Sequence, residues 1–300
     1  MDRKPGIGAK FAPHNLTPEE LVEYTPEWIG ERSADGRPRV GDDILDRMRS
    51  VTITQAWTVL RNAGFHWQYE GGWYCTHPGQ VLVGRALTAA YMPRRPDMRD
   101  VMEKKGDQLG CVGDQISWPI DLLSPGDVYV ADVFGKIDQG AVIGDNLATA
   151  IYAKTGNGVV HDAAVRDVDG LRELDGFTSF VRGVHPTYAS PTIMLTGCNT
   201  PIRVGGVTVM PGDVVLGRPD GVVFVPPHLA EKVVKTSELI RLRDAFGKRR
   251  LADGVYTTGQ IDRQWTDDIE ADFSAWLEDR IDDLPVPREA IQELLQDRTW

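Results

Sequence analysis

The sequence contains only three cysteines, Cys75, Cys111 and Cys198, and none of them belongs to a C-x-x-C pair. This scarcity argues against a disulfide framework and against a thiolate zinc site. There is no long apolar run, and the opening stretch MDRKPGIGAKFAPHN lacks the apolar segment of a signal peptide. We therefore expect a cytoplasmic protein that does not enter a membrane.

Lys and Arg are also fewer than Asp and Glu. The 300 residues include 33 Lys and Arg against 44 Asp and Glu, which gives a formal net charge of −11. Nucleic-acid-binding proteins usually carry a basic stripe, so nucleic acid is not an expected partner. Most of the acidic excess lies in residues 259–300, which hold twelve Asp and Glu and four Arg. A P-loop, a serine nucleophile elbow and a dinucleotide fingerprint are absent as well.

The most regular part of the chain alternates between strand and helix patterns. A Pro-Gly turn leads into an apolar strand at 124–133, and a helix pattern follows that begins near Asp145 or Asn146 and ends at Gly156. Then come a strand in GVVHDA, a short helix in VDGLRELDG and a strand in FTSFVRG. Strands and helices that alternate over short links predict a parallel βαβαβ unit in an α/β fold.

Three regions are expected in the chain as a whole. Residues 1–42 are rich in Pro, Gly and charge and are predicted to form an N-terminal arm. Residues 43–235 are predicted to form the main domain, and 236–300 a helical C-terminal extension. The segment 265–281 carries an apolar stripe at helical spacing, which must be buried either within its own domain or against a neighbouring subunit.

The stretch 200–227 differs from the α/β unit, because it contains short strands and hairpin turns at Gly205-Gly206 and Asp220-Gly221. The tetrapeptide PGDV occurs twice, at 125–128 and at 211–214. Two copies do not make a repeat protein, so we interpret them as turns that are well suited to start a strand.

Polar residues follow the predicted parallel strands where each strand ends. Asp145 follows the first strand, Arg166 and Asp167 follow the second, and His185 follows the third. Ligands gather at the carboxyl ends of parallel strands, so these four side chains are expected along one edge. The free amides at the start of the helix that follows Asp145 point to the same edge and form an anion site.

Each of these residues also has a purely structural explanation. Asp167 precedes a short helix and Asp145 a longer one, so both are candidate helix caps. His185 stands before a proline in a loop, and His161 lies inside an apolar strand and is expected in the core. Together, however, two carboxylates and a guanidinium suit a hard cation beside a carboxylate-binding group.

The motifs GDNLATA, GVVHDAAVRDVDGL, VRGVHP and PIRVGGVTVMPGDVVLGRPDGVVFVPP resemble the RraA-like family, which includes 4-hydroxy-4-methyl-2-oxoglutarate and 4-carboxy-4-hydroxy-2-oxoadipate aldolases. The resemblance covers about residues 45–235, and the spacing from Asp145 to Arg166-Asp167 is its most specific feature. It implies a swivelling α/β-β sandwich that assembles as trimers or dimers of trimers, with sites at subunit boundaries.

The resemblance also implies roles for individual residues. Asp167 matches the residue that helps hold a divalent metal, Mg²⁺ or Mn²⁺, and Asp145 matches one that holds a metal-bound water. Arg166 matches the residue that contacts the 2-oxo acid. The backbone amides of Asn146, Leu147 and Ala148 correspond to those that bind the pyruvyl carboxylate. The implied activity is retro-aldol cleavage through a pyruvate enolate, with oxaloacetate decarboxylation through the same enolate.

The sequence departs from the family pattern at several positions. Ala163 stands where the family often has Gly, and His185 stands where a small hydroxyl residue is expected. His185 as an additional acid or base would suit a second hypothesis, a lyase or hydratase on another oxo acid or a sugar-derived acid. A third hypothesis is a binding protein that regulates a ribonuclease. Family members of that kind carry a different residue in place of Asp167, so its presence favours an enzyme.

Overall fold

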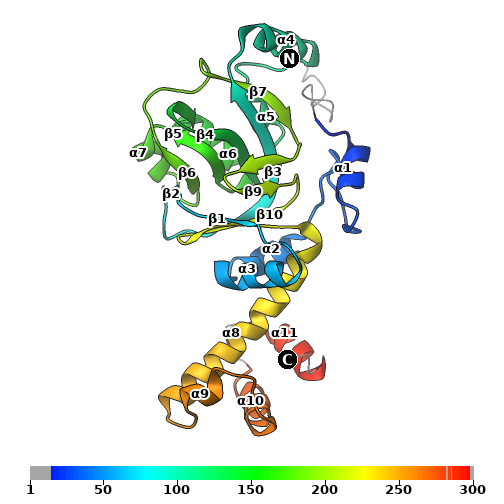
Figure 1. Ribbon diagram of the computed structural model, residues 1–300, viewed down its shortest axis with the longest axis vertical. Coiled ribbons are helices and arrows are strands. Elements are labelled where there is room, and N and C mark those ends of the chain that lie inside the picture. Colours follow the sequence, from blue (N-terminus) through cyan, green and yellow to red (C-terminus); the bar gives the residue numbers. More distant parts are fainter. Residues whose placement is uncertain (1–14, 282, 285, 298–300) are drawn as a thin grey trace. The chain divides into compact units, whose positions relative to one another are not determined.

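The computed structural model describes residues 15–281, 283–284 and 286–297 (Figure 1). The chain divides into two compact units, Met1–Ala230 and Glu231–Trp300. Within the described ranges, no helix combines the length and the apolar character needed to cross a membrane.

A mixed sheet of nine strands forms the centre of the first unit, in the order β1-β11-β10-β3-β4-β5-β6-β2, with β7 paired to β3 beside this path. The strands β3, β4, β5 and β6 are neighbours and run parallel. The strand bounds are β1 Tyr69–Glu70, β2 Tyr74–Cys75, β3 Leu82–Pro93, β4 Asp127–Ile143, β5 Val159–Val165, β6 Ser179–Val184, β7 Ile193–Cys198, β8 Ile202–Val204, β9 Val207–Val209, β10 Val214–Arg218 and β11 Gly221–Val225.

Short helices surround this sheet, and the second unit is helical. Their bounds are α1 Pro18–Tyr24, α2 Asp42–Met48, α3 Ile53–Asn62, α4 Pro96–Leu109, α5 Trp118–Asp121, α6 Asp145–Thr155, α7 Val168–Arg172, η1 Pro227–Leu229, α8 Ala230–Ala252, α9 Thr258–Ile261, α10 Asp267–Asp279 and α11 Arg288–Asp297. The predicted helix after the first parallel strand is confirmed as α6, which ends at Gly156 in the left-handed conformation with a φ of 68°.

The two faces of the sheet bury different partners. Ala148 and Ile151 of α6 pack with residues of β4 and β5 in one apolar cluster. On the other face the hairpin β8–β9 covers the sheet through Ile202, Val204 and Val207. The predicted βαβαβ unit is therefore confirmed as β4-α6-β5-α7-β6, with α6 on one face of the sheet (Figure 1).

Two parts of this sheet differ from the sequence prediction. The first parallel strand does not end at residue 133, because β4 continues to Ile143 with three shifts of register against β5. Phe134 and Gln139 have positive φ values of 48° and 50° inside this longer strand, so it carries an irregular, partly exposed excursion. The strands β10 and β11 are not a separate layer, because β10 pairs with β3 in the main sheet.

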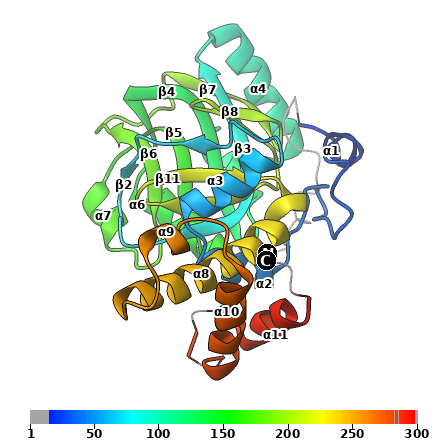
Figure 2. The ribbon, with the colours of Figure 1, turned by 60° about the horizontal axis from the view of Figure 1, so that its bottom comes forward.

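In the second unit the predicted apolar stripe is buried inside the unit itself. Phe273 and Trp276 of α10 pack on Phe246 of α8, with ring centroids 5.3 and 5.7 Å apart. Ile291 of α11 belongs to the same cluster. Figure 2 shows the helices α8, α10 and α11 of this unit. The stripe at 265–281 thus has its partner within its own unit.

Candidate functional site

The carboxyl ends of β4, β5 and β6 lie level at one edge of the sheet. Ile143, Val165 and Val184 pair across the three strands. The Arg166 amide donates to the carbonyl of Ile143 at 3.1 Å, and the His185 amide donates to the carbonyl of Val165 at 3.0 Å. The edge predicted to collect the polar residues is therefore a single continuous edge.

Asp167 adopts the left-handed conformation, with φ 56° and ψ 44°. This backbone turn brings its carboxylate back to the preceding residue, where Oδ2 lies 2.8 Å from Nη1 of Arg166. The side chain makes no capping bond to α7, so capping does not account for this carboxylate. Asp tolerates this conformation better than most residues, yet it costs about 1–2 kcal/mol, and such strain is concentrated at functional sites.

The Arg166–Asp167 pair lies directly against the start of α6. A Cβ placed on Gly144 would fall 2.3 Å from Asp167 Oδ2 and 3.2 Å from Arg166 Cζ. Only glycine leaves room for the pair at this point. Gly144 is also the N-cap of α6 and has no side chain to occupy the helix amides.

The amides at the start of α6 are not equally free. The Asn146 amide donates to Oδ1 of Asp145 at 2.8 Å, and the Ala148 amide donates to the carbonyl of Gly144 at 3.0 Å. Within the described residues the Leu147 amide has no hydrogen-bond acceptor. Of the three amides expected to bind a carboxylate, the one at Leu147 is therefore available, with a favourable helix dipole.

Asp145 is the first residue of α6 and faces Gly170 of α7. A Cβ on Gly170 would meet the Cβ of Asp145 at 2.8 Å and its Oδ2 at 2.9 Å. Asp145, the first residue of α6, and Asp167, the N-cap of α7, thus both lie at the start of α6. Gly144 leaves room for Asp167 there, and Gly170 leaves room for Asp145.

The donor set at this edge is compatible with a magnesium-type ion. Among the described residues, no group of three or more His, Cys, Asp or Glu is positioned to hold a metal. Asp145 and Asp167 nevertheless supply carboxylate oxygens, and the Asp167 side chain is 38% exposed. Because Mg²⁺ keeps several water ligands and uses one or two carboxylates, two partly open aspartates fit it.

His185 makes its contacts with the excursion of β4. Its Nδ1 accepts from the amides of Gln139 and Thr187, each at 3.2 Å. Its Nε2 lies 3.1 Å from Oδ1 of Asp138. Since Nδ1 accepts two bonds, the ring proton belongs on Nε2 and faces Asp138. The His185 ring therefore stabilises the irregular part of β4 around Asp138 and Gln139, and none of these contacts involves Arg166.

His161 lies in the core, as expected from its place in an apolar strand. Its ring is fully buried and meets Tyr129 edge-on, with centroids 4.7 Å apart. Burial lowers the pKa of His161 to about 3, so the ring is neutral at physiological pH. It has no part in the edge described above.

A second polar group, which sequence reasoning missed, lies on the other side of β5. Arg182 donates to Asp162 at 2.6 Å and to Glu70 at 2.8 Å, and its guanidinium lies 3.9 Å from the Trp73 ring centroid. Burial raises the pKa of nearby Asp132. The available signal was a charged residue, Asp162, inside an otherwise apolar strand.

The model of the RraA-like family, described as Aldolase/RraA, matches residues 42–224. "Protein DlpA" of Legionella pneumophila subsp. pneumophila is 29% identical over 188 residues, which cover 62% of this chain and 28% of that protein. A protein of Halalkalibacterium halodurans named "Putative 4-hydroxy-4-methyl-2-oxoglutarate aldolase" is 33% identical over 132 residues, 44% of this chain and 61% of that protein. The chain thus spans less than two thirds of either relative.

Two solved structures share the fold. Streptomyces coelicolor RraAS2, titled an unusual member of the RNase ES inhibitor RraA protein family, is 26% identical with a TM-score of 0.59. The match covers 71% of this chain and 98% of that one. An uncharacterized protein from Pseudomonas syringae pv. tomato is 23% identical with a TM-score of 0.61, and covers 75% of this chain and 98% of its own. The second likeness concerns the fold alone.

Proposed function

Because the chain belongs to the RraA-like family, we propose that it is a divalent-metal-dependent lyase acting on a 4-hydroxy-2-oxo acid. The observation that carries this proposal is the Arg166–Asp167 pair, held against Gly144 at a helix start where the Leu147 amide is free. The site combines a guanidinium and a free amide for an anion with two carboxylates for a cation.

Asp167 would hold the metal, Mg²⁺ or Mn²⁺, and Asp145 would hold it through a water. When bound, the metal supplies a positive charge that polarises the 2-oxo group. Arg166 is 2.8 Å from Asp167 and its side chain is 38% exposed, so it can turn to an incoming substrate. We assign Arg166 to the oxygen atoms of the 2-oxo acid and the Leu147 amide to its carboxylate. Charge that develops on the C2 oxygen then faces positive groups already in place.

The bond that breaks in this reaction is C3–C4. A base takes the proton of the C4 hydroxyl, the C4 fragment leaves as a carbonyl compound, and the bonding electrons form the pyruvate enolate. Protonation at C3 then gives pyruvate. We assign the base to Asp145, directly or through a water, because it lies at the same helix start. Decarboxylation of oxaloacetate would use the same enolate.

The proposal is tested by measuring pyruvate release from 4-hydroxy-4-methyl-2-oxoglutarate and from oxaloacetate, with lactate dehydrogenase as coupling enzyme. Turnover should require Mg²⁺ or Mn²⁺ and stop with EDTA. The variant Asp167→Asn, which tolerates the left-handed backbone, should lose at least about 100-fold in kcat/KM.

Asp169→Asn is the matched control, because Asp169 is an exposed aspartate on the same short helix and lies 4.0 Å from Arg172. It should retain activity. Turnover of oxaloacetate alone would assign another native substrate, including an oxo acid or sugar-derived acid. Absence of both turnover and metal binding would contradict the lyase proposal. It would favour a binding protein like the ribonuclease inhibitors.

We also propose that copies of this chain associate near the site, as the family resemblance implies for trimers or dimers of trimers. Three apolar side chains around this edge are exposed: Ile137 at 44%, Val184 at 46% and Tyr188 at 55%. Exposed apolar groups beside a site are typical of an interaction surface. Sedimentation equilibrium of the native chain and of Val184→Glu tests this proposal.

A further inference from the structure

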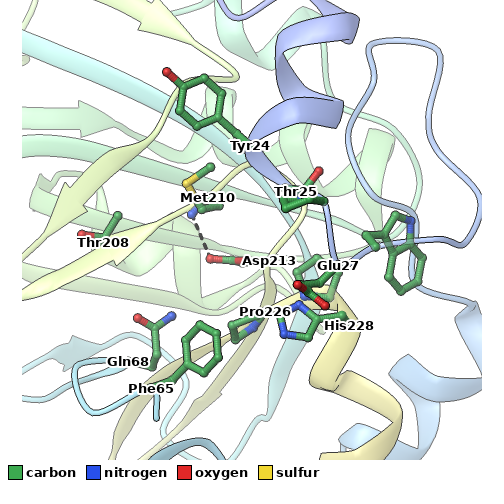
Figure 3. A pocket seen from close by; sticks show the side chains of 13 residues that line it. Tyr24, Thr25, Glu27, Phe65, Gln68, Thr208, Met210, Asp213, Pro226 and His228 are labelled. Atoms are coloured by element: carbon green, nitrogen blue, oxygen red, sulfur yellow. Dashed lines mark hydrogen bonds between the residues drawn. The ribbon is translucent and has the colours of Figure 1, made fainter. Parts of the chain in front are cut away.

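A cavity of about 340 Å³ lies in the first unit, lined by segments far apart in the sequence. Residues 24–28 begin at the last residue of α1, Phe65 and Gln68 follow α3, 208–213 run from β9 to the start of β10, and 226–228 follow β11. Figure 3 shows side chains from all four segments around it. The volume lies within the range of small-molecule sites in proteins, about 300–1,000 Å³.

Asp213, one of the lining residues, has a buried carboxylate that pairs with no cation among the described residues. It is 2% exposed, and its hydrogen bond among the described residues runs from the Met210 amide to Oδ2 at 2.8 Å (Figure 3). A buried carboxylate is costly unless it is paired with a positive group. Once ionised, this carboxylate is a negative charge at the wall of a cavity, with no cationic partner among the described residues.

The two PGDV turns show what is missing at Asp213. In the first turn, Asp127 accepts from the Ser124 amide at 2.9 Å, the same bond three residues back that Asp213 makes. Asp127 is also buried, but the guanidinium of Arg37 lies 3.1 Å from its Oδ2. The second turn makes the same hydrogen bond as the first, but no described residue takes the place of Arg37 beside Asp213. The space beside Asp213 belongs to the cavity.

The rest of the lining favours a positive charge as well. Of the residues that the structure describes, no Lys or Arg lines the cavity, and Glu27 adds a second carboxylate. The rings of Phe65 and His228 lie 5.8 Å apart between centroids and present aromatic surface. Burial lowers the pKa of His228, so this ring is neutral at pH 7. Arg32 lies behind the wall, where its guanidinium donates to backbone carbonyls that include those of Thr25 and Trp28.

We propose that this cavity binds a small organic cation, an amine or quaternary ammonium with an apolar body, whose charge pairs with Asp213. Aromatic rings together with carboxylates are the usual surroundings of such ligands. The proposed oxo-acid substrate is an anion and would be repelled here, so this inference does not rest on the proposed lyase activity.

The test uses the full chain and two probes of similar size and opposite charge, benzyltrimethylammonium and 3-phenylpropionate. Isothermal titration at pH 8 should detect the cation, with Asp213→Asn weakening its affinity at least about 10-fold and 3-phenylpropionate not binding. Glu27→Gln should weaken the affinity for the cation more than Glu23→Gln, because Glu23 is exposed on α1 and does not line the cavity.

The affinity for the cation should also rise between pH 6 and pH 8. Four titratable groups line the cavity, namely Asp213, Glu27, His228 and Tyr24. Over this interval Asp213 loses its proton, because burial raises its pKa to about 7, and none of the other three gains positive charge as the pH rises. Phe65→Leu, which keeps an apolar side chain, provides a second variant if Asp213→Asn does not fold. It should lower the affinity for the cation several-fold.

Four outcomes would overturn the proposal. These are equal affinities of the native chain and Asp213→Asn, equal affinities for the cation and the anion, an affinity that falls with rising pH, and no binding of benzyltrimethylammonium up to about 10 mM.

Discussion

Replacing Asp213 by Asn should make the first unit more stable, and increasingly so as the pH rises. The Asn side chain has nearly the same shape, and its amide oxygen can still accept from the Met210 amide at the position of Oδ2. The substitution removes only the charge. In the native chain that charge is 2% exposed and unpaired among the described residues, so burial raises the pKa of Asp213 to about 7.

The magnitude follows from proton linkage. The pKa of Asp213 lies near its ordinary value of 3.8 in the unfolded chain and at about 7 in the folded chain. The folded state binds this proton more tightly, so the contribution of Asp213 to stability is fully present below pH 3.8 and is lost as the pH rises to about 7. A difference of about 3 units, at about 1.4 kcal/mol per unit, gives a loss of about 4 kcal/mol.

The measurement is hydrogen–deuterium exchange of peptides from β3 and β10, the paired strands beside Asp213, at matched pH between 5 and 8. These peptides report the opening of the first unit without interference from the helical unit. The ratio of exchange rates between variant and native chain cancels the intrinsic effect of pH. The free-energy difference in favour of Asp213→Asn should grow by about 3 kcal/mol across this range, because about two pH units of it lie below the folded pKa of about 7.

Asp220→Asn is the control, because it removes the same charge from an exposed position in the β10–β11 turn and should show no such trend. A difference that stays constant with pH, or a variant less stable than the native chain at pH 8, would refute the reasoning. Either result would mean that Asp213 is already neutralised in the folded protein.

Two further substitutions probe the turns and the site. Arg37→Met leaves Asp127 as a buried charge without a partner and should lower the free energy of unfolding by about 3–5 kcal/mol at pH 7. Adding Asp127→Asn should recover part of this loss in urea unfolding, and no recovery would contradict the ion-pair argument. Gly144→Ala places a methyl group 2.3 Å from Asp167 Oδ2 and should reduce pyruvate release at least about 10-fold. Gly79→Ala meets nothing within 4 Å and serves as its control, so equal activities would refute the close packing at Gly144.

The sequence by itself determined the features that depend on neighbours a few residues away. The end of the helix Asp145–Thr155 follows from the left-handed glycine at 156, and the hairpin at Gly205-Gly206 follows from its turn residues. The predicted side-chain cap at Asp145 is not formed, because the N-cap is Gly144 and Asp145 is the first helical residue. The parallel order of three strands follows from short crossovers. The same local motifs carry the family resemblance, and they placed Arg166 and Asp167 after the second parallel strand.

The tertiary structure decided how those residues are used. The left-handed turn at Asp167 rotates its carboxylate onto Arg166, an arrangement that residue type alone leaves open against helix capping. Which helix amide stays free depends on bonds to Asp145 and Gly144 that have specific geometry. The strand β7 pairs with β3, about a hundred residues earlier in the chain, and no sequence pattern indicated that partner.

The two PGDV turns show this division most clearly. They are identical in sequence, lead into β4 and β10 on the two sides of β3, and make the same turn bond. One carboxylate is neutralised by Arg37, which comes from a segment ninety residues earlier, and the other faces a cavity. Local hydrogen bonds are encoded within four residues and can be predicted from them. The charge that surrounds a buried group is set by segments that only folding brings together, so the fate of each aspartate was decided by the tertiary structure.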